Sequence, residues 1–280
     1  MSQAVTKIKS RIKSVSSAYK VTSAMKLVST VKLKQWKGRM IAYKDYINEI
    51  DETVDVLLSY AKSKNIPFIT TINNEASKNL YLVISSTLGL CGSYNNNIFK
   101  VSDAAITKDD EAIILGGKGL AHYKDGEFTS IPGYDEYSVN DKVMVNKLTD
   151  YILNEYNKGT YKEVHIIYSE YKNSLVFLAK DYKLLPFTHE QKELNGYPPI
   201  VEPSEKELLD NIIPFYLRSE IYAKLFESAV CEQAARSNAM ENATNNAKDL
   251  LDDLKIEFNK ARQGAITQEI IEIVAASKGV

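Results

Sequence analysis

The chain has little cysteine, proline or tryptophan, with 2, 7 and 1 residues respectively among 280. The two cysteines, Cys91 and Cys231, exclude a disulfide scaffold and indicate a reducing compartment. Its three His residues lack the spacing of metal ligands, so we expect no metal site. No apolar run approaches the roughly 20 residues that cross a bilayer, and no secretory signal is recognisable.

Acidic residues are missing from the start of the chain. Residues 1–40 carry eight Lys and two Arg, and the first acid is Asp45, although the net charge of the whole chain is -1. Such a run fits a nucleic acid, a membrane surface or transit peptide, or an acidic protein partner. From charge alone, nucleic acid is the leading hypothesis.

Proline is also absent from both ends. Residues 4–62 and 215–278 contain no Pro and one Gly each. If continuous, each segment forms a helix of about 90 Å, which needs a partner for its apolar stripe. Residues 186–214 hold five of the seven Pro and are predicted to be a linker.

Each end carries a stripe at helical spacing. The first consists of Ile8, Ile12, Val15 and Tyr19, continued by Met25, Val28, Val31 and Gln35. The last consists of Ile221, Leu225, Ala235, Ala239, Ala243, Ala247, Leu250, Leu254, Phe258, Ala261 and Ala265. Because alanine lets a second helix approach closely, the pattern predicts an antiparallel coiled coil of the N- and C-terminal helices.

The middle of the chain alternates between strand and helix patterns. The expected strands are Leu80–Ser85, Ala112–Leu115, Val164–Tyr168 and Leu175–Ala179. The expected helices are Val143–Tyr156 and one near Ile98 capped by Asn95–Asn97, and Gly116-Gly117 is expected to form a turn. This alternation predicts a small, mostly parallel α/β sheet. We divide the chain into an N-terminal coiled-coil helix (1–62), a central α/β domain with its linker (63–200) and a C-terminal coiled-coil helix (201–280).

The glycine turn Gly89–Gly92 follows the first strand and contains Cys91. It could cradle a phosphate or present a nucleophilic thiol, which would make the chain a small α/β enzyme. However, no Lys-Ser/Thr pair follows it, and Gly-x-Gly-x-x-Gly is absent. We therefore interpret it as a tight strand-to-helix connection with a small buried cysteine.

Four separated segments carry a family resemblance. They are Ile8–Lys34, Gly89–Asn95, Glu232–Leu251 and Arg262–Val274. In these regions the chain resembles the γ subunit of F-type ATP synthases, and the likeness spans residues 4–97 and 202–276. The resemblance implies a central stalk with a Rossmann-like α/β domain, which transmits torque and couples ATP synthesis or hydrolysis to rotation and proton transport.

The resemblance also implies the partners. They are three catalytic and three noncatalytic ring subunits, a small ε-type rotor subunit and a c-type membrane ring, but no nucleic acid. Mg-ATP and ADP would be bound by the ring subunits, so this chain would have neither a cofactor nor a catalytic site. The complex would be peripheral, at the cytoplasmic face of a bacterial inner membrane.

Site residues are implied by the same resemblance. Contacts to a catalytic subunit would be made by Arg262, Gln263, Thr267 and Glu269, with Met25 and Lys26 in the neighbouring N-terminal turn. A basic face toward acidic levers of the catalytic subunits would include Lys9, Arg11, Lys13 and Lys20. Glu202 would contact partners at the base.

The sequence departs from the family pattern in three places. Thr87-Leu88 replaces Asp-Arg before Gly89, Pro199–Val201 precedes Glu202 where the family has an aromatic residue, and Gly264 replaces Ala. The first two lie outside the coiled coil, which leaves a second hypothesis: the rotor of a specialised ATPase not coupled to protons. A basic coiled-coil protein that binds nucleic acid is the third.

Overall fold

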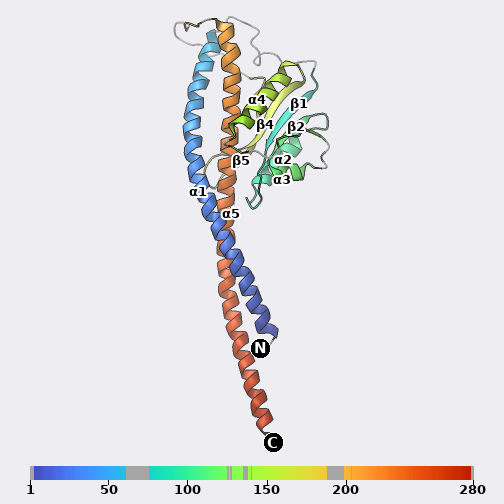
Figure 1. The fold of residues 1–280 in the computed structure, drawn as a ribbon, viewed down its shortest axis with the longest axis vertical. Helices are drawn as coiled ribbons and strands as arrows, with labels where there is room; N and C mark the ends of the chain where they lie inside the picture. Colours follow the sequence, from blue (N-terminus) through green and yellow to red (C-terminus); the bar gives the residue numbers. More distant parts are fainter. Residues whose placement is uncertain are drawn as a thin grey trace. The chain divides into compact units, whose positions relative to one another are not determined.

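The computed structural model describes residues 3–60, 76–124, 126, 128–134, 138–139, 141–187, 199–202 and 204–278. The chain forms two units. One joins residues 1–31 to residues 236–280 and is called the helical unit; the other, residues 32–235, is called the α/β unit. Helices α1 (Gln3–Tyr60) and α5 (Glu205–Lys278) each contribute to both units (Figure 1).

Both terminal segments are long helices, as the scarcity of proline predicts. However, α5 begins at Glu205 rather than near Phe215, so the prediction of a linker over 186–214 is wrong for its last part. Pro214 lies inside α5, where it removes the hydrogen bond to the carbonyl of Asp210. Ile213 is only 3% exposed, and its burial offsets this cost.

The α/β unit is built on a sheet whose described strands have the order β3-β2-β1-β4-β5. The strands are β1 (Lys78–Ile84), β2 (Glu111–Leu115), β3 (Thr129–Ser130), β4 (Tyr161–Tyr171) and β5 (Phe177–Leu185). β1 pairs in parallel with β2 and β4, β2 pairs in parallel with β3, and only the edge strand β5 is antiparallel. This confirms the mostly parallel α/β sheet, and the order matches that of Rossmann-type sheets.

Alternate residues of β1 face the two sides of the sheet. Val83 packs on one side with Ile98 of α2 (Tyr94–Ala105), next to α3 (Gly117–His122). Leu82 packs on the other side with Leu148 of α4 (Lys142–Asn157) and with Leu217 of α5. The core therefore has two layers, and α5 contributes to both.

The short helix α3 and the strand β3 were not predicted. Gly117 begins α3 rather than forming a plain turn, although the N-cap residue Gly116 and two of the first three helix residues, Gly117 and Gly119, are glycine. Gly116 has φ 96°, and a Cβ there would lie 2.4 Å from the Ser85 carbonyl oxygen. Ser85 Oγ accepts a hydrogen bond from the Gly119 amide at 2.9 Å. These glycines allow α3 to approach β1 closely. Local sequence preference alone predicts only a turn at such a run of glycines.

The start of α2 also differs from the prediction. Ser93 occupies the N-cap position without a side-chain hydrogen bond to a backbone amide of the first turn, and Asn95–Asn97 lie inside the helix. Asn95 Oδ1 instead accepts from the amide of Ser86 at 3.0 Å, so this asparagine ties the helix to the end of β1.

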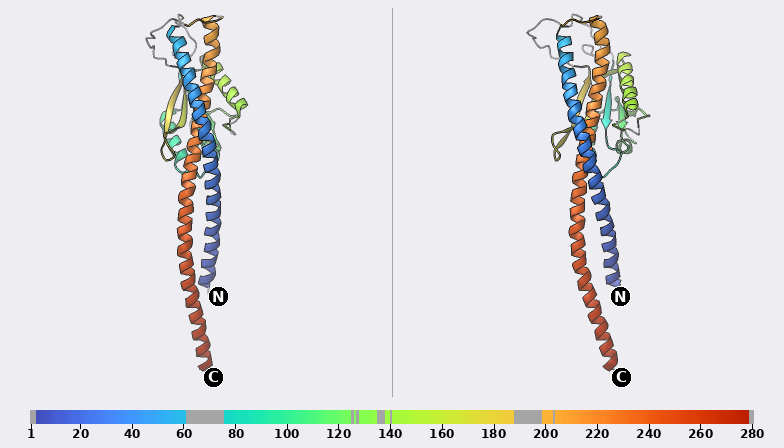
Figure 2. Two further views of the ribbon diagram at one scale, coloured as in Figure 1. Left: turned by 90° about the vertical axis from the view of Figure 1, so that its left-hand side faces the viewer. Right: turned by 60° about the vertical axis from the view of Figure 1, so that its left-hand side comes forward.

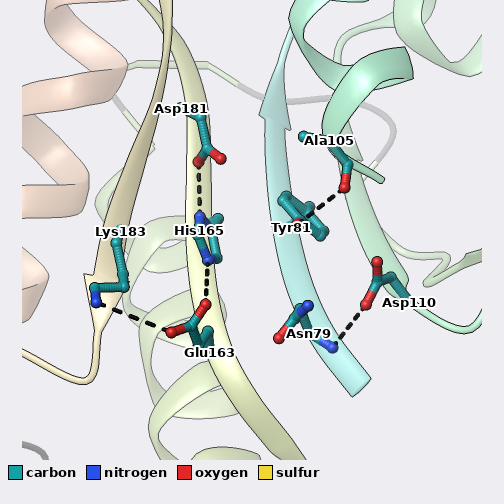
Figure 3. Close-up of polar contacts among 8 residues, drawn as sticks. All are labelled: Asn79, Tyr81, Ala105, Asp110, Glu163, His165, Asp181 and Lys183. Carbon is teal, nitrogen blue, oxygen red and sulfur yellow. Dashed lines mark hydrogen bonds and ion pairs between the residues drawn. The ribbon is translucent and has the colours of Figure 1, made fainter. Parts of the chain in front are cut away.

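A half-buried histidine links the edge strand β5 to β4 (Figure 3). His165 Nδ1 lies 2.8 Å from Asp181 Oδ1, and its Nε2 lies 3.2 Å from Glu163 Oε2. Its ring packs on Tyr81 at 5.0 Å between centroids, and Lys183 Nζ lies 3.9 Å from the other oxygen of Glu163. Because neutral imidazole has one N–H donor, carboxylates at both nitrogens favour imidazolium. Burial lowers the pKa of His165, but the bonds to Asp181 and Glu163 outweigh it, and the pKa is raised.

We expect the stability of the α/β unit to fall with rising pH because of His165. Its contribution is complete below the unfolded pKa of about 6.5 and is lost as the pH rises through the raised folded pKa. Urea unfolding across this range should show a decrease of about 1 kcal/mol or more. His165→Gln should flatten this dependence, because it removes the ionisable ring. Equal slopes in the wild type and His165→Gln would contradict the assignment.

Candidate functional site

The helical unit is an antiparallel pair made from the start of α1 and the end of α5 (Figures 1 and 2). The hydroxyl of Thr244 donates to Thr22 Oγ1 at 3.0 Å, and the hydroxyls of Thr30 and Ser237 are 3.0 Å apart. As residue numbers rise along α1, those of their partners fall along α5. This confirms the predicted antiparallel pairing of the two ends.

The predicted stripe on α5 faces α1 in most places. Its members within the helical unit are half-buried or buried at Ala239, Ala243, Ala247, Leu254, Phe258, Ala261 and Ala265. The assignment of Leu250 to the stripe is wrong, because Leu250 is 38% exposed while its neighbour Leu251 is half-buried. Small side chains dominate this line of contact between α1 and α5, which is called the seam, so the two backbones can approach closely.

On α1 the predicted stripe holds only at its start. Ile8, Ile12, Val15 and Tyr19 are half-buried, as is Met25. The continuation through Val28, Val31 and Gln35 is wrong: Val28 is 54% exposed, Val31 is 60% exposed, and Gln35 is also exposed. The seam instead passes through Thr22 and Ser29, and Ser29 is 2% exposed. Apolar spacing fails here because hydroxyl side chains, rather than valines, fill the contact.

The four α5 residues implied to contact a catalytic subunit lie together within two turns. Arg262, Gln263, Thr267 and Glu269 are all exposed. Gln263 and Thr267 are four residues apart and Arg262 and Glu269 are seven apart, so each pair shares a helix face. The hydroxyl of Thr267 donates to the Gln263 carbonyl at 3.0 Å and is therefore held against the helix. The side chains of Gln263 and Arg262 are longer, and their amide and guanidinium groups extend farther from the helix axis.

Met25 and Lys26 are not close to this group, so the expectation of a neighbouring turn is wrong. Lys26 Nζ forms an ion pair with Glu241 Oε1 at 2.5 Å across the seam. At about 1.5 Å per residue, the distance along α5 from Glu241 to Arg262 is about 30 Å. Met25 and Lys26 therefore lie apart from these four residues, and antiparallel register sets Arg262 against the first turns of α1.

The basic residues of α1 are exposed but do not form one face. Each residue turns the helix by about 100°, which puts Lys9, Lys13 and Lys20 within about 40° of one another and Arg11 on the opposite flank. All four are exposed. The positive charge therefore lies on both sides of the seam, rather than along a single basic face.

Exposed apolar side chains on both helices were missed by the sequence reasoning. On α1 they are Val21, Leu27, Val28 and Val31, which are 54–67% exposed. On α5 they are Ile266, Ile270, Ile271, Ile273 and Val274, which are 47–68% exposed. The last turns of α5 continue past the first residues of α1 (Figure 2), so α1 leaves them uncovered. Exposed apolar side chains in this number are typical of surfaces that contact a partner.

Cys91 lies in a tight connection between β1 and α2, as interpreted from the sequence. It is 2% exposed, and its sulfur lies 3.3 Å from Asn95 Nδ2 and 3.6 Å from Ser86 Oγ, neither of which is a general base. The turn is closed by positive φ angles of 62° at Leu90 and 58° at Gly92. Leu90 is 63% exposed, so the loop displays an apolar side chain.

Helix α5 bonds to the carboxyl end of β4, where Rossmann-type folds place their ligands. The amide of Ser169 donates to Ser228 Oγ at 3.0 Å, and the thiol of Cys231 donates to the Ser169 carbonyl at 3.3 Å. The amide of Tyr171 donates to Glu227 Oε1 at 2.9 Å. Burial raises the pKa of Cys231 to about 12, which keeps this thiol protonated as a donor. In this chain, backbone groups at that end of the sheet are bonded to a helix of the same chain.

The remaining predicted residue, Glu202, is exposed just before α5 in the α/β unit. Among the described residues, no three His, Cys, Asp or Glu side chains converge in a way that could hold a metal ion. The helices described also include none with the length and apolarity of a membrane span.

These features define a class: a protein whose own two ends pair as helices, with an α/β unit between them in sequence. Comparison with known proteins agrees. The family model described as ATP synthase matches residues 4–280. The ATP synthase gamma chain of Ureaplasma urealyticum is 36% identical over 96% of this chain and 98% of its own length. That of Mycoplasma mobile is 37% identical over 97% of both chains.

Solved structures have the same fold at low sequence identity. A chain of the Euglena gracilis mitochondrial ATP synthase is similar with a TM-score of 0.70 and 18% identity, covering 98% of this chain and 94% of its own. A chain of the Tetrahymena thermophila central stalk and c-ring gives 0.54 and 22% identity, covering 80% of this chain and 99% of its own. The chain belongs to the ATP synthase gamma chain family.

The seam of the helical unit is tested by one pair of leucines. Leu254 is 2% exposed, and Leu254→Ala should lower the unfolding free energy of this unit by about 2–3 kcal/mol through lost burial and a residual cavity. Leu250→Ala, one turn away and 38% exposed, should change it by about 0.5 kcal/mol or less. Amide hydrogen exchange of residues 240–260 measures both. Equal effects of the two variants would contradict the register described above.

Proposed function

We propose that the chain is the central-stalk subunit of a rotary F-type ATP synthase, in which it transmits torque between the nucleotide-binding ring and the membrane rotor. The full-length likeness to gamma chains supports this function and does not favour either a nucleic-acid-binding protein or a rotor uncoupled from protons. The observation that carries the proposal is the exposed apolar surface on both helices of the helical unit, which on α1 is flanked by basic residues. Such a surface needs a partner to cover it.

The helical unit would stand inside a ring of three catalytic and three noncatalytic subunits. Its flanks differ in side chains, so the ring subunits would meet different surfaces at the same time. Rotation would then move each catalytic subunit through different states in turn. The nucleotide affinity of each site would depend on the angle of the rotor, and this dependence is a coupling free energy. The close-packed seam lets the two helices turn together.

The chemistry would belong to the partners. Mg-ATP and ADP would bind the ring subunits, and this chain would contribute neither a catalytic group nor a cofactor. Arg262, Gln263, Thr267 and Glu269 would contact a loop of a catalytic subunit, and the Met25–Lys26 turn would contact a second region about 30 Å away. Lys9, Arg11, Lys13 and Lys20 would face acidic segments.

The α/β unit would meet the membrane rotor. Glu202 and its neighbours would contact a small ε-type subunit and a c-type membrane ring. The complex would then be peripheral, on the cytoplasmic side of a bacterial membrane. Recovery of the native complex, followed by mass spectrometry of its subunits, tests this assembly.

Loss of the polar groups at the end of α5 should slow catalysis by the ring. After co-expression with the ring subunits, Arg262→Ala with Gln263→Ala should lower multisite ATP turnover roughly tenfold, the equivalent of about 1.4 kcal/mol. Gln268→Ala is the matched control, because its amide is bonded to Glu272 of the same helix at 2.9 Å. A complex without this chain, or turnover indifferent to the double variant, would exclude the stalk function.

Charge reversal on one flank of α1 should weaken the complex. Lys9→Glu with Lys13→Glu should reduce recovery of the ring with this chain, and the loss should shrink at high salt because the contact is electrostatic. Lys100→Glu with Lys147→Glu, at exposed positions of the α/β unit, makes the same change in net charge. We expect this control to retain the ring, and a similar loss in both variants would argue against a specific basic contact.

A further inference from the structure

We draw no further inference here: the strongest candidate, the exposed apolar side chains of Leu88 and Leu90 after β1 and of Leu175 and Val176 after β4 at the carboxyl edge of the sheet, carries none, because no contact of the described residues shows what covers this surface.

Discussion

The close contact between the two ends of the chain is the constraint on which the helical unit depends. Alanines at 243 and 247 on α5, with Thr22 and Ser29 on α1, make a seam of small side chains. A helix that long is unstable without a partner, because its propensity alone does not hold it together. With bulky residues in the seam the helices would stand farther apart, and the hydroxyl pairs at Thr22–Thr244 and Thr30–Ser237 could not form. The exposed apolar residues follow from the same constraint, because valines displaced from a narrow seam face outward.

In the α/β unit, α5 occupies the carboxyl end of the sheet, where many Rossmann-type folds bind a ligand. Its Ser228 and Glu227 side chains accept from backbone amides at the end of β4, and Cys231 donates to a carbonyl there. The same helix buries Leu217 against the other side of the sheet. A single helix thus hydrogen-bonds to the end of the sheet and also packs in its apolar core. A fold that in other proteins binds nucleotides here holds a helix of its own chain in place.

Much of this could be predicted from sequence, because long-range periodicity and proline-free runs are strong signals. The two helices, the parallel sheet and the tight turn at Cys91 follow from such patterns. The failures have a common cause, since packing outweighed local preference. Pro214 stays in a helix because Ile213 is buried, and Val28 is exposed because Ser29 fits the seam. The separation of Lys26 from Arg262 required the register of the pair, which residue types alone do not contain.

The pairing of the two ends also sets the order of events during synthesis. The hydroxyl pair Thr22–Thr244 joins residues 222 positions apart. At roughly 5–20 residues per second, the ribosome makes the first half of this pair about 10 to 45 s before the second. During that interval the start of α1 has no helix to cover its apolar stripe, although the α/β unit can already be folding. Contacts of such sequence separation form late and slowly, so the nascent chain displays a basic, partly apolar segment until α5 has been made.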